Sequence, residues 1–244
     1  MTRDAGCRGA RLKHCNPGAA MKSCHVARVL CATALALLAA TAGAAPLSAD
    51  DAGWRAYARG DYAAARVYYE RAANGGDRLA QYNIAIMLIS GQGGAEDIGA
   101  GVVWLRKAAE AGMAQAQYNL GLLYESGVGL PRTLTLATEW WQRAAAQGHV
   151  QAQVDLATQY FLGRGAPKDW KLAAKWYEAA AENGDPGAQY IMGSFYEHGD
   201  GVAQDLRKAL DWYVHAARQG DVGAAAQAKD VARRLADAAP PPPH

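Results

Sequence analysis

The sequence predicts an all-α protein, a right-handed superhelical solenoid of stacked antiparallel helix pairs. Glycine, glutamine and tryptophan each recur at an interval of 36 residues. A fixed period of about 20 to 50 residues is typical of proteins in which one supersecondary unit stacks on the next. The recurring residues are Gly76, Gly112, Gly148, Gly184 and Gly220, then Gln81, Gln117, Gln153 and Gln189, and then Trp104, Trp140, Trp176 and Trp212.

Each unit is predicted to hold two helices. In one unit, Ala116, Leu120 and Tyr124 lie four residues apart, which places them on one face of a helix. A Gly-x-Gly turn at 127–129 follows, and a second apolar stripe begins at Ala137 and includes Trp140. The pattern therefore indicates two antiparallel helices of about 13–15 residues.

The expected helix ends carry suitable residues. An Asp or Thr, whose side-chain oxygen can cap a helix N-terminus, stands at the start of each second helix. The periodic glycine ends that helix, where a left-handed conformation costs glycine least. Capping also accounts for Asp169 and Asp205, two aspartates that could otherwise suggest general acid-base chemistry. The capping positions are Asp61, Asp97, Thr133, Asp169 and Asp205.

Residues 1–44 resemble a secretory signal peptide. A basic stretch at 22–28 precedes an apolar run from Val29 to Leu38, and Ala42-Gly43-Ala44 supplies small residues for cleavage. The run is short for a bilayer span, so we expect cleavage near Ala44 and a periplasmic or secreted chain without an integral membrane span. A membrane anchor or a buried first helix is the alternative, and Met21 is an alternative start.

The leader also holds all four cysteines and the excess of basic over acidic residues. The chain carries 25 basic and 23 acidic residues, and six of the basic residues but only one acidic residue lie in 1–44. The remaining chain is mildly acidic, which argues against nucleic-acid binding. Without cysteine it has no disulfide, thiolate metal site or cysteine nucleophile.

The units follow one another in order along the chain. We expect a shorter, tetratricopeptide-like opening helix pair, four full repeats, one capping helix with a polar side, and a disordered proline-rich tail. The predicted boundaries are 45–76 for the opening pair, 77–112, 113–148, 149–184 and 185–220 for the repeats, 221–238 for the cap and 239–244 for the tail.

The pattern resembles the Sel-one-like (Sel1-like) repeat family, relatives of the tetratricopeptide repeats. The resemblance is carried by Ala-x-Tyr-Asn-Leu-Gly-x-x-Tyr at 116–124, by the Gly-x-Gly turns, and by the Trp-Tyr, Ala-Ala and Gly that close each unit. It spans residues 77–220 as four units. It implies a helical superhelix whose concave face is lined mainly by the first helix of each pair.

Motifs of catalysis and metal binding are missing from the sequence. It contains no Gly-x-Ser-x-Gly, Ser-x-x-Lys or His-Glu-x-x-His, so we expect no enzyme activity, no catalytic residue, no cofactor and no metal. His149, His198, His215 and His244 fall at unrelated repeat positions and are predicted to be solvated. A weak metal site at His198 is a poor alternative, because the spacing and the number of ligands are unsuitable.

The candidate partner-binding residues follow from resemblance to tetratricopeptide packing. Positions one and two residues before the Leu-Gly pair point partly toward the concave groove, with Glu125, Thr158, Ser194 and Glu197 beside them. A ladder of tyrosine and asparagine suits recognition of an extended peptide; the alternative is that these residues brace adjacent repeats. The predicted contact residues are Tyr82, Asn83, Tyr118, Asn119, Asp155 and Tyr190.

The expected function is therefore an exported protein-protein interaction module, an adaptor, scaffold or regulator in the bacterial cell envelope, with a protein or peptide partner. Two alternatives remain. One is an envelope hydrolase of the β-lactamase-like type, a label that some family members carry. The other is a structural part of polysaccharide or secretion machinery, for which the aromatic content offers contacts to sugars.

Overall fold

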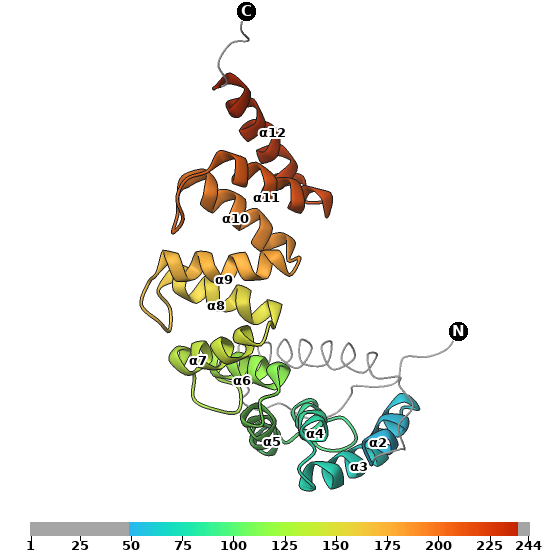
Figure 1. Cartoon of the computed structure of the whole chain (residues 1–244). Helices are drawn as coiled ribbons and strands as arrows, with labels where there is room; N and C mark the ends of the chain where they lie inside the picture. The colour runs from blue at the N-terminus through green and yellow to red at the C-terminus, as the bar shows by residue number, and fades with distance from the viewer. Residues whose placement is uncertain (1–48, 239–244) are drawn as a thin grey trace, which may run out of the picture.

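The computed structural model describes residues 49–238, and every regular element in that range is a helix (Figure 1). The helices α3 to α11 have 13 residues each, and α12 has 16. They are α2 (Ala49–Ala58), α3 (Tyr62–Asn74), α4 (Arg78–Ser90), α5 (Ile98–Glu110), α6 (Ala114–Ser126), α7 (Leu134–Ala146), α8 (Val150–Leu162), α9 (Trp170–Glu182), α10 (Pro186–His198), α11 (Leu206–Arg218) and α12 (Val222–Asp237).

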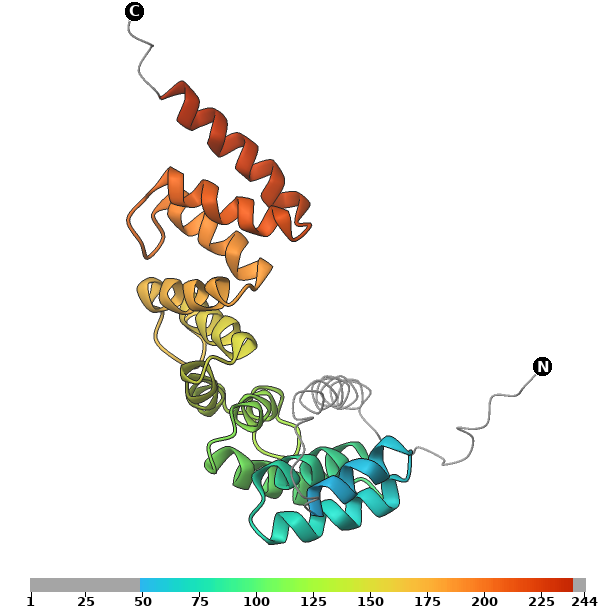
Figure 2. The same ribbon diagram turned by 45° about the vertical axis from the view of Figure 1, so that its right-hand side comes forward.

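Consecutive helices form the main packing contacts of the described chain. The helix pairs stack into a curved rod, with the even-numbered helices along the inner side of the curve and the odd-numbered helices along the outer side (Figures 1 and 2). This confirms the prediction of an all-helical solenoid built from stacked pairs. We call the side lined by α4, α6, α8 and α10 the inner face.

The residues expected to end the helices do so, with one exception. Asp61, Asp97, Asp169 and Asp205 are N-caps whose side chains accept from backbone N–H groups of the first turn. Thr133 occupies the same position but does not cap α7, because its hydroxyl donates to the Pro131 carbonyl at 3.3 Å. The periodic glycines follow the second helices with φ between +84° and +95°, as predicted.

The second glycine of each turn makes a close approach that the repeat pattern did not predict. At Gly201 an added β-carbon would lie 2.1 Å from the backbone oxygen of Trp170, the first residue of α9. At Gly93 it would lie 2.2 Å from the backbone oxygen of Tyr62, the first residue of α3. Each of these turns is thus seated on the first turn of a helix in the preceding unit.

The periodic glutamine joins one unit to the next. Its side-chain amide donates to the carbonyl of the residue eight positions earlier, at the end of the preceding helix. The distances are 3.4 Å for Gln81 to Ala73, 3.0 Å for Gln117 to Ala109, 3.2 Å for Gln153 to Ala145 and 3.1 Å for Gln189 to Ala181. Each of these carbonyls also accepts from the backbone N–H of the periodic glycine three residues later, so the glutamine is a second donor to the same helix end.

In three of the four units, the side-chain oxygen of this glutamine accepts a hydrogen bond from a second amide side chain. Thirty residues after the glutamine, Gln147, Asn183 and Gln219 donate to Gln117, Gln153 and Gln189 at 2.8, 3.3 and 2.8 Å, respectively. The equivalent residue for Gln81 is Ala111, and the buried Gln81 Oε1 has no hydrogen-bond partner within the described residues.

Replacing Ala111 with glutamine is expected to stabilise the protein. The new side chain takes the place that Gln147 and Gln219 hold in their units, with similar backbone angles, and satisfies Gln81 Oε1. A buried polar group without a partner costs about 1–3 kcal/mol, so we expect a gain of about 1 kcal/mol in the free energy of unfolding, measured by urea titration. Ala111→Leu is the control; an equal gain from leucine would contradict the hydrogen-bond explanation.

The C-terminal helix is held by a charged contact. Glu197 on α10 is 7% exposed, accepts from the Tyr213 hydroxyl at 2.8 Å, and pairs with Arg234 on α12. Tyr213 and Arg234 thus bond to one carboxylate oxygen of Glu197 each. Burying this carboxylate without such partners would be costly. The exposed side of α12 carries Lys229 and Arg233, consistent with a terminal helix that faces solvent.

Two of the predicted segments, the leader at 1–44 and the tail at 239–244, lie outside the described residues. Within 49–238, no helix combines the length and the hydropathy needed to cross a bilayer.

Candidate partner-binding surface

Each inner helix presents one stripe of side chains to the inner face. On α8 the stripe consists of Gln151, Asp155, Thr158 and Leu162, and it includes the exposed Gln151 and Leu162. The predicted contact residues lie on this stripe or beside it, and the structure divides them by their surroundings.

Tyr82 and Asn119 brace two adjacent repeats. Both are completely buried, and the Asn119 amide donates to the Tyr82 hydroxyl at 3.0 Å. Asn119 also accepts from Gln115 at 3.1 Å. For these two residues the geometry supports the bracing interpretation, because their polar atoms are used within the protein.

Asn83 differs from Asn119, although both occupy the same repeat position. The residue is 7% exposed, and its amide nitrogen has no hydrogen-bond partner in the part of the chain that the structure describes. Buried amide donors are nearly always paired in proteins. Asn83 therefore leaves one unused donor at the position where the stripe of α4 meets the inner face.

Tyr118 and His149 form a ring pair that the sequence did not predict. Their centroids lie 4.5 Å apart at an interplanar angle of 24°. His149 caps α8, since its Nδ1 accepts from the Ala152 backbone N–H at 3.2 Å, and its Nε2 lies 3.0 Å from the Gln115 side-chain oxygen. These bonds assign the neutral tautomer with the proton on Nε2.

The prediction that every histidine is solvated is thus wrong for His149. Burial lowers the pKa of its imidazole. The available signal was its position: His149 stands at the capping position of a first helix, where other units have Asp77 and Asp185. A half-buried cap was recognisable from that register, whereas the stacking on Tyr118 was not.

Asp155 is the charged member of the predicted set. It is half-buried, its carboxylate accepts from Gln151 at 3.2 Å, and the Tyr118 hydroxyl donates to it. The pKa of Asp155 is raised to about 6, chiefly by burial and to a smaller extent by the negative charge of Glu125, against the opposing effect of the two hydrogen bonds. Burial, followed by the charge of Asp155, raises the pKa of Tyr118.

The pair Tyr118–Asp155 repeats the pair Tyr82–Asn119 one unit later, with a carboxylate in place of an amide. In both pairs the tyrosine lies 37 residues before its partner. The ion pairs found among residues 49–238 join Arg233 or Arg234 to Asp230 or Glu197; none involves Asp155 or Glu125. Asp155 consequently carries a charge that the described chain does not compensate.

Tyr190 lies half-buried at the C-terminal part of the inner face. Its ring is 5.4 Å from the ring of Tyr213, and Gly223 of α12 approaches its edge. Beside Asp155, the Thr158 and Tyr177 hydroxyls lie 2.8 Å apart. The structure therefore brings Tyr118, Asp155, Thr158 and Tyr177 together, whereas Asn83 and Tyr190 lie on other helices of the same face.

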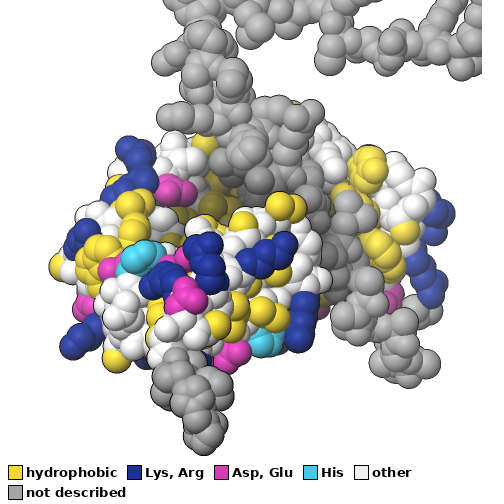
Figure 3. Space-filling view, turned by 90° about the horizontal axis from the view of Figure 1, so that it is seen from above, with side chains coloured by type: hydrophobic (Ala, Val, Ile, Leu, Met, Phe, Trp, Pro, Cys, Tyr) yellow, Lys and Arg dark blue, Asp and Glu magenta, His cyan; other side chains and the backbone are white. Residues whose placement is uncertain are grey.

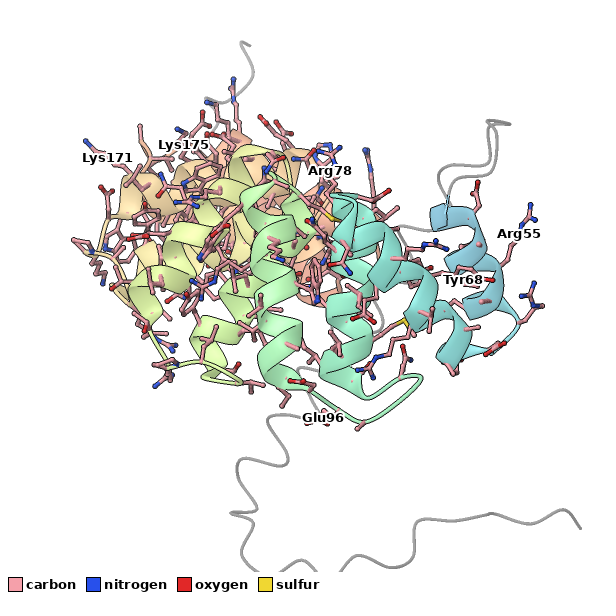
Figure 4. The ribbon with its side chains drawn as sticks, turned by 90° about the horizontal axis from the view of Figure 1, so that it is seen from below. Arg55, Tyr68, Arg78, Glu96, Lys171 and Lys175 are labelled. Carbon is pink, nitrogen blue, oxygen red and sulfur yellow. The ribbon has the colours of Figure 1, made fainter. Side chains whose placement is uncertain are left out.

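The outer side of the rod has a different character. Lys171 and Lys175 of α9 project from it into solvent (Figure 4). A shallow hollow of about 290 Å³ lies between α9 and α11 and is lined in part by Glu178, Tyr196 and Trp212. Tyr196 donates to Glu178 at 2.9 Å, so the aromatic hydroxyl and the carboxylate satisfy each other.

Within residues 49–238, no group of three or more side chains suited to metal binding comes together. On the face shown in Figure 3, basic, acidic and hydrophobic side chains are interspersed instead of forming a patch of one sign.

Helix pairs that stack into a curved rod define a helical repeat protein, whose extended face is its usual binding surface. The Sel1 repeat model matches five stretches of the sequence, residues 53–77, 78–113, 114–149, 150–185 and 186–221. The chain therefore belongs to the Sel1 repeat family. This repeat is a protein-interaction fold.

Two solved structures share the fold. The Sel1 repeat protein from Oxalobacter formigenes is 34% identical, with a TM-score of 0.68 and coverage of 73% of each chain. A protective antigen of uropathogenic Escherichia coli with an SLR fold is also 34% identical, with a TM-score of 0.64. That match covers 67% of this chain and 35% of the antigen, so the chain spans about a third of the antigen. A comparison with curated proteins found no match.

Proposed function

We propose that this protein is an exported, non-enzymatic interaction module that holds an extended segment of a partner protein along its inner face. It acts as an adaptor or scaffold in the bacterial cell envelope. Two groups on that face carry the proposal. Among residues 49–238, the Asn83 amide nitrogen has no hydrogen-bond partner, and the Asp155 carboxylate, which accepts from Gln151 and Tyr118, has no counter-ion.

An extended polypeptide supplies what these groups lack. Its backbone carbonyls can accept a hydrogen bond from the Asn83 amide once that buried side chain rotates outward, and its side chains alternate on either side of the strand. The length is also suitable, because an extended chain advances about 3.3 Å per residue, and a segment of several residues reaches across neighbouring inner helices. Export is supported by the basic stretch, apolar run and small residues of 1–44.

Photo-crosslinking in living cells tests the proposal. A photoreactive amino acid placed at Leu162, which is 48% exposed on the inner stripe, is expected to capture one protein at one short segment, identified by mass spectrometry. The same amino acid at Lys171, exposed on the outer side, serves as the matched position. Ser194→Arg, which fills the inner face, should abolish capture from Leu162, and Glu139→Arg on the outer side should not.

Equal capture from both positions, or capture that Ser194→Arg leaves unchanged, would contradict binding on the inner face. The same cells, when fractionated, give the location. N-terminal sequencing of the protein from the envelope fraction is expected to begin just after Ala44; a full-length chain in the cytoplasm would contradict export.

A further inference from the structure

Asp155 carries a negative charge that its structural role does not require. Tyr82 and Asn119 show that a tyrosine and an amide form the same inter-repeat contact in this protein. In that contact the Asn119 amide donates to the Tyr82 hydroxyl, whereas the Tyr118 hydroxyl donates to Asp155, so a neutral amide can bond to the tyrosine as well as a carboxylate can. The contact between Tyr118 and residue 155 therefore explains a polar side chain at this position, but not its charge.

The surroundings of Asp155 are poor in positive charge. From α6 it faces Tyr118 and Glu125, from α9 it is close to Tyr177, and on its own helix it is bonded to Gln151. His149, at the start of α8, is neutral in its hydrogen-bonded tautomer. None of these groups is a cation, and Glu125 adds a second negative charge.

Such a position is suited to a cation from outside the chain. A half-buried carboxylate interacts more strongly with an opposite charge than one in bulk water does, because the effective dielectric constant is lower. An arginine is a good match, since its guanidinium can bond to both oxygens of a carboxylate and stack on aromatic rings. The adjacent Tyr118–His149 ring pair and the exposed Leu162 provide apolar surface for its alkyl stem.

A second observation on the same face also indicates a peptide. Asn83 lies at the same repeat position as Asp155, two inner helices away, and its buried amide nitrogen is unpaired. One extended segment that crosses the inner helices passes both positions. It can meet the half-buried Asp155 carboxylate through a side chain, and it can accept from the Asn83 amide once that buried side chain rotates outward. A small free cation would satisfy Asp155 alone.

We propose that Asp155 is the specificity-determining residue of the inner face, and that it selects a partner segment with an arginine or lysine at one fixed position. This inference rests on the proposed function and assigns the chemical class of the segment that is bound.

The experiment is a selection of random nine-residue peptides displayed on phage against three purified proteins: the wild type, Asp155→Asn and Asp211→Asn. The Asp155→Asn variant should fold, because it places an asparagine opposite Tyr118, as Asn119 lies opposite Tyr82 in the preceding unit. Circular dichroism checks the fold. Asp211 is exposed on the outer helix α11, so its variant removes the same charge away from the inner face.

We expect the wild type and Asp211→Asn to enrich peptides with an arginine or lysine at one position, and Asp155→Asn to enrich peptides without one. An enriched peptide is then compared with the same peptide in which citrulline replaces the arginine. Citrulline should weaken binding to the wild type at least tenfold and leave binding to Asp155→Asn unchanged, as measured by calorimetry.

The outcomes separate the two proposals. If the wild type enriches no peptide, or Ser194→Arg does not prevent binding, the proposed function fails. If peptides bind on the inner face but show no basic position, or if citrulline has an equal effect on both proteins, the function stands and the assignment to Asp155 is wrong.

A pH titration gives an independent measurement. A bound guanidinium stabilises the ionised carboxylate, so affinity for the arginine peptide should be highest at neutral pH and fall as the pH drops below about 6, where free Asp155 becomes protonated. Glu125, Tyr118, Tyr177 and His149 are the titratable groups around it, and the citrulline peptide controls for their effects. Parallel pH profiles for the two peptides would overturn the proposal.

Discussion

Replacing Gly201 with alanine is expected to destabilise the protein by about 2–5 kcal/mol. The residue has φ +71°, where an L side chain costs about 1–2 kcal/mol. The added carbon would also meet the Trp170 backbone oxygen at 2.1 Å. A backbone atom at the start of α9 cannot rotate away, so the turn must lift from the helix, and such overpacking costs about 1–3 kcal/mol more. Urea unfolding followed by circular dichroism measures the change.

Gly184→Ala is the matched control for this prediction. Gly184 also has positive φ, +91°, but an alanine there would meet nothing within 4 Å. It should cost only the conformational part, about 1–2 kcal/mol. If the two variants lost equal stability, the seating of the turn on the preceding helix would have no energetic importance.

Replacing Trp141 with alanine is expected to cost about 3–5 kcal/mol. Trp141 is 1% exposed, its indole nitrogen donates to the Tyr118 carbonyl at 3.2 Å, and its ring covers Gly121, where an added β-carbon would lie 2.4 Å from the nitrogen. The variant leaves a cavity between α6 and α7 and an unpaired carbonyl. Thermal unfolding and urea titration should both show the loss.

The neighbouring repeat supplies a compensating change. Where this unit has Gly121 and Trp141, the preceding unit has Ala85 and Leu105, both completely buried. Trp141→Leu alone should be strongly destabilising, and adding Gly121→Ala should recover part of the loss by filling the space that the indole vacates. If Gly121→Ala destabilised the Trp141→Leu protein further, the packing explanation for the paired residues would be wrong.

The repeat unit could be predicted because its signals are local. Apolar spacing, capping residues and terminal glycines each act within one or two turns of helix, and four of the five predicted second-helix caps, including Asp169, bond as expected. Thr133 failed because its hydroxyl had a nearer acceptor in the Pro131 carbonyl. Local competition of this kind is decided by a rotamer, which the sequence does not specify.

The inner face was harder to predict because its contacts pass between repeats. Tyr82 and Tyr118 each reach a residue 37 positions later, and this depends on how far one inner helix is displaced along the next. The repeat period shows that each of these tyrosines is followed directly by an asparagine, as in Tyr82-Asn83. It does not show that Tyr82 bonds to the asparagine of the next unit, because it does not specify how the helices are displaced. The same limit applies to the periodic glutamine, whose position was evident and whose bond to the residue eight positions earlier was not.

Because helices pack mainly against their sequence neighbours, the hydrophobic residues form a series of clusters along the rod instead of one centre. Nothing in such an arrangement fixes the number of units. A duplication or deletion of 36 residues would join units through the same kind of helix-to-helix junction. Recombination can therefore lengthen or shorten, by one unit at a time, the polypeptide segment that the inner face binds. Substitutions within one unit can change the side chains that this unit recognises.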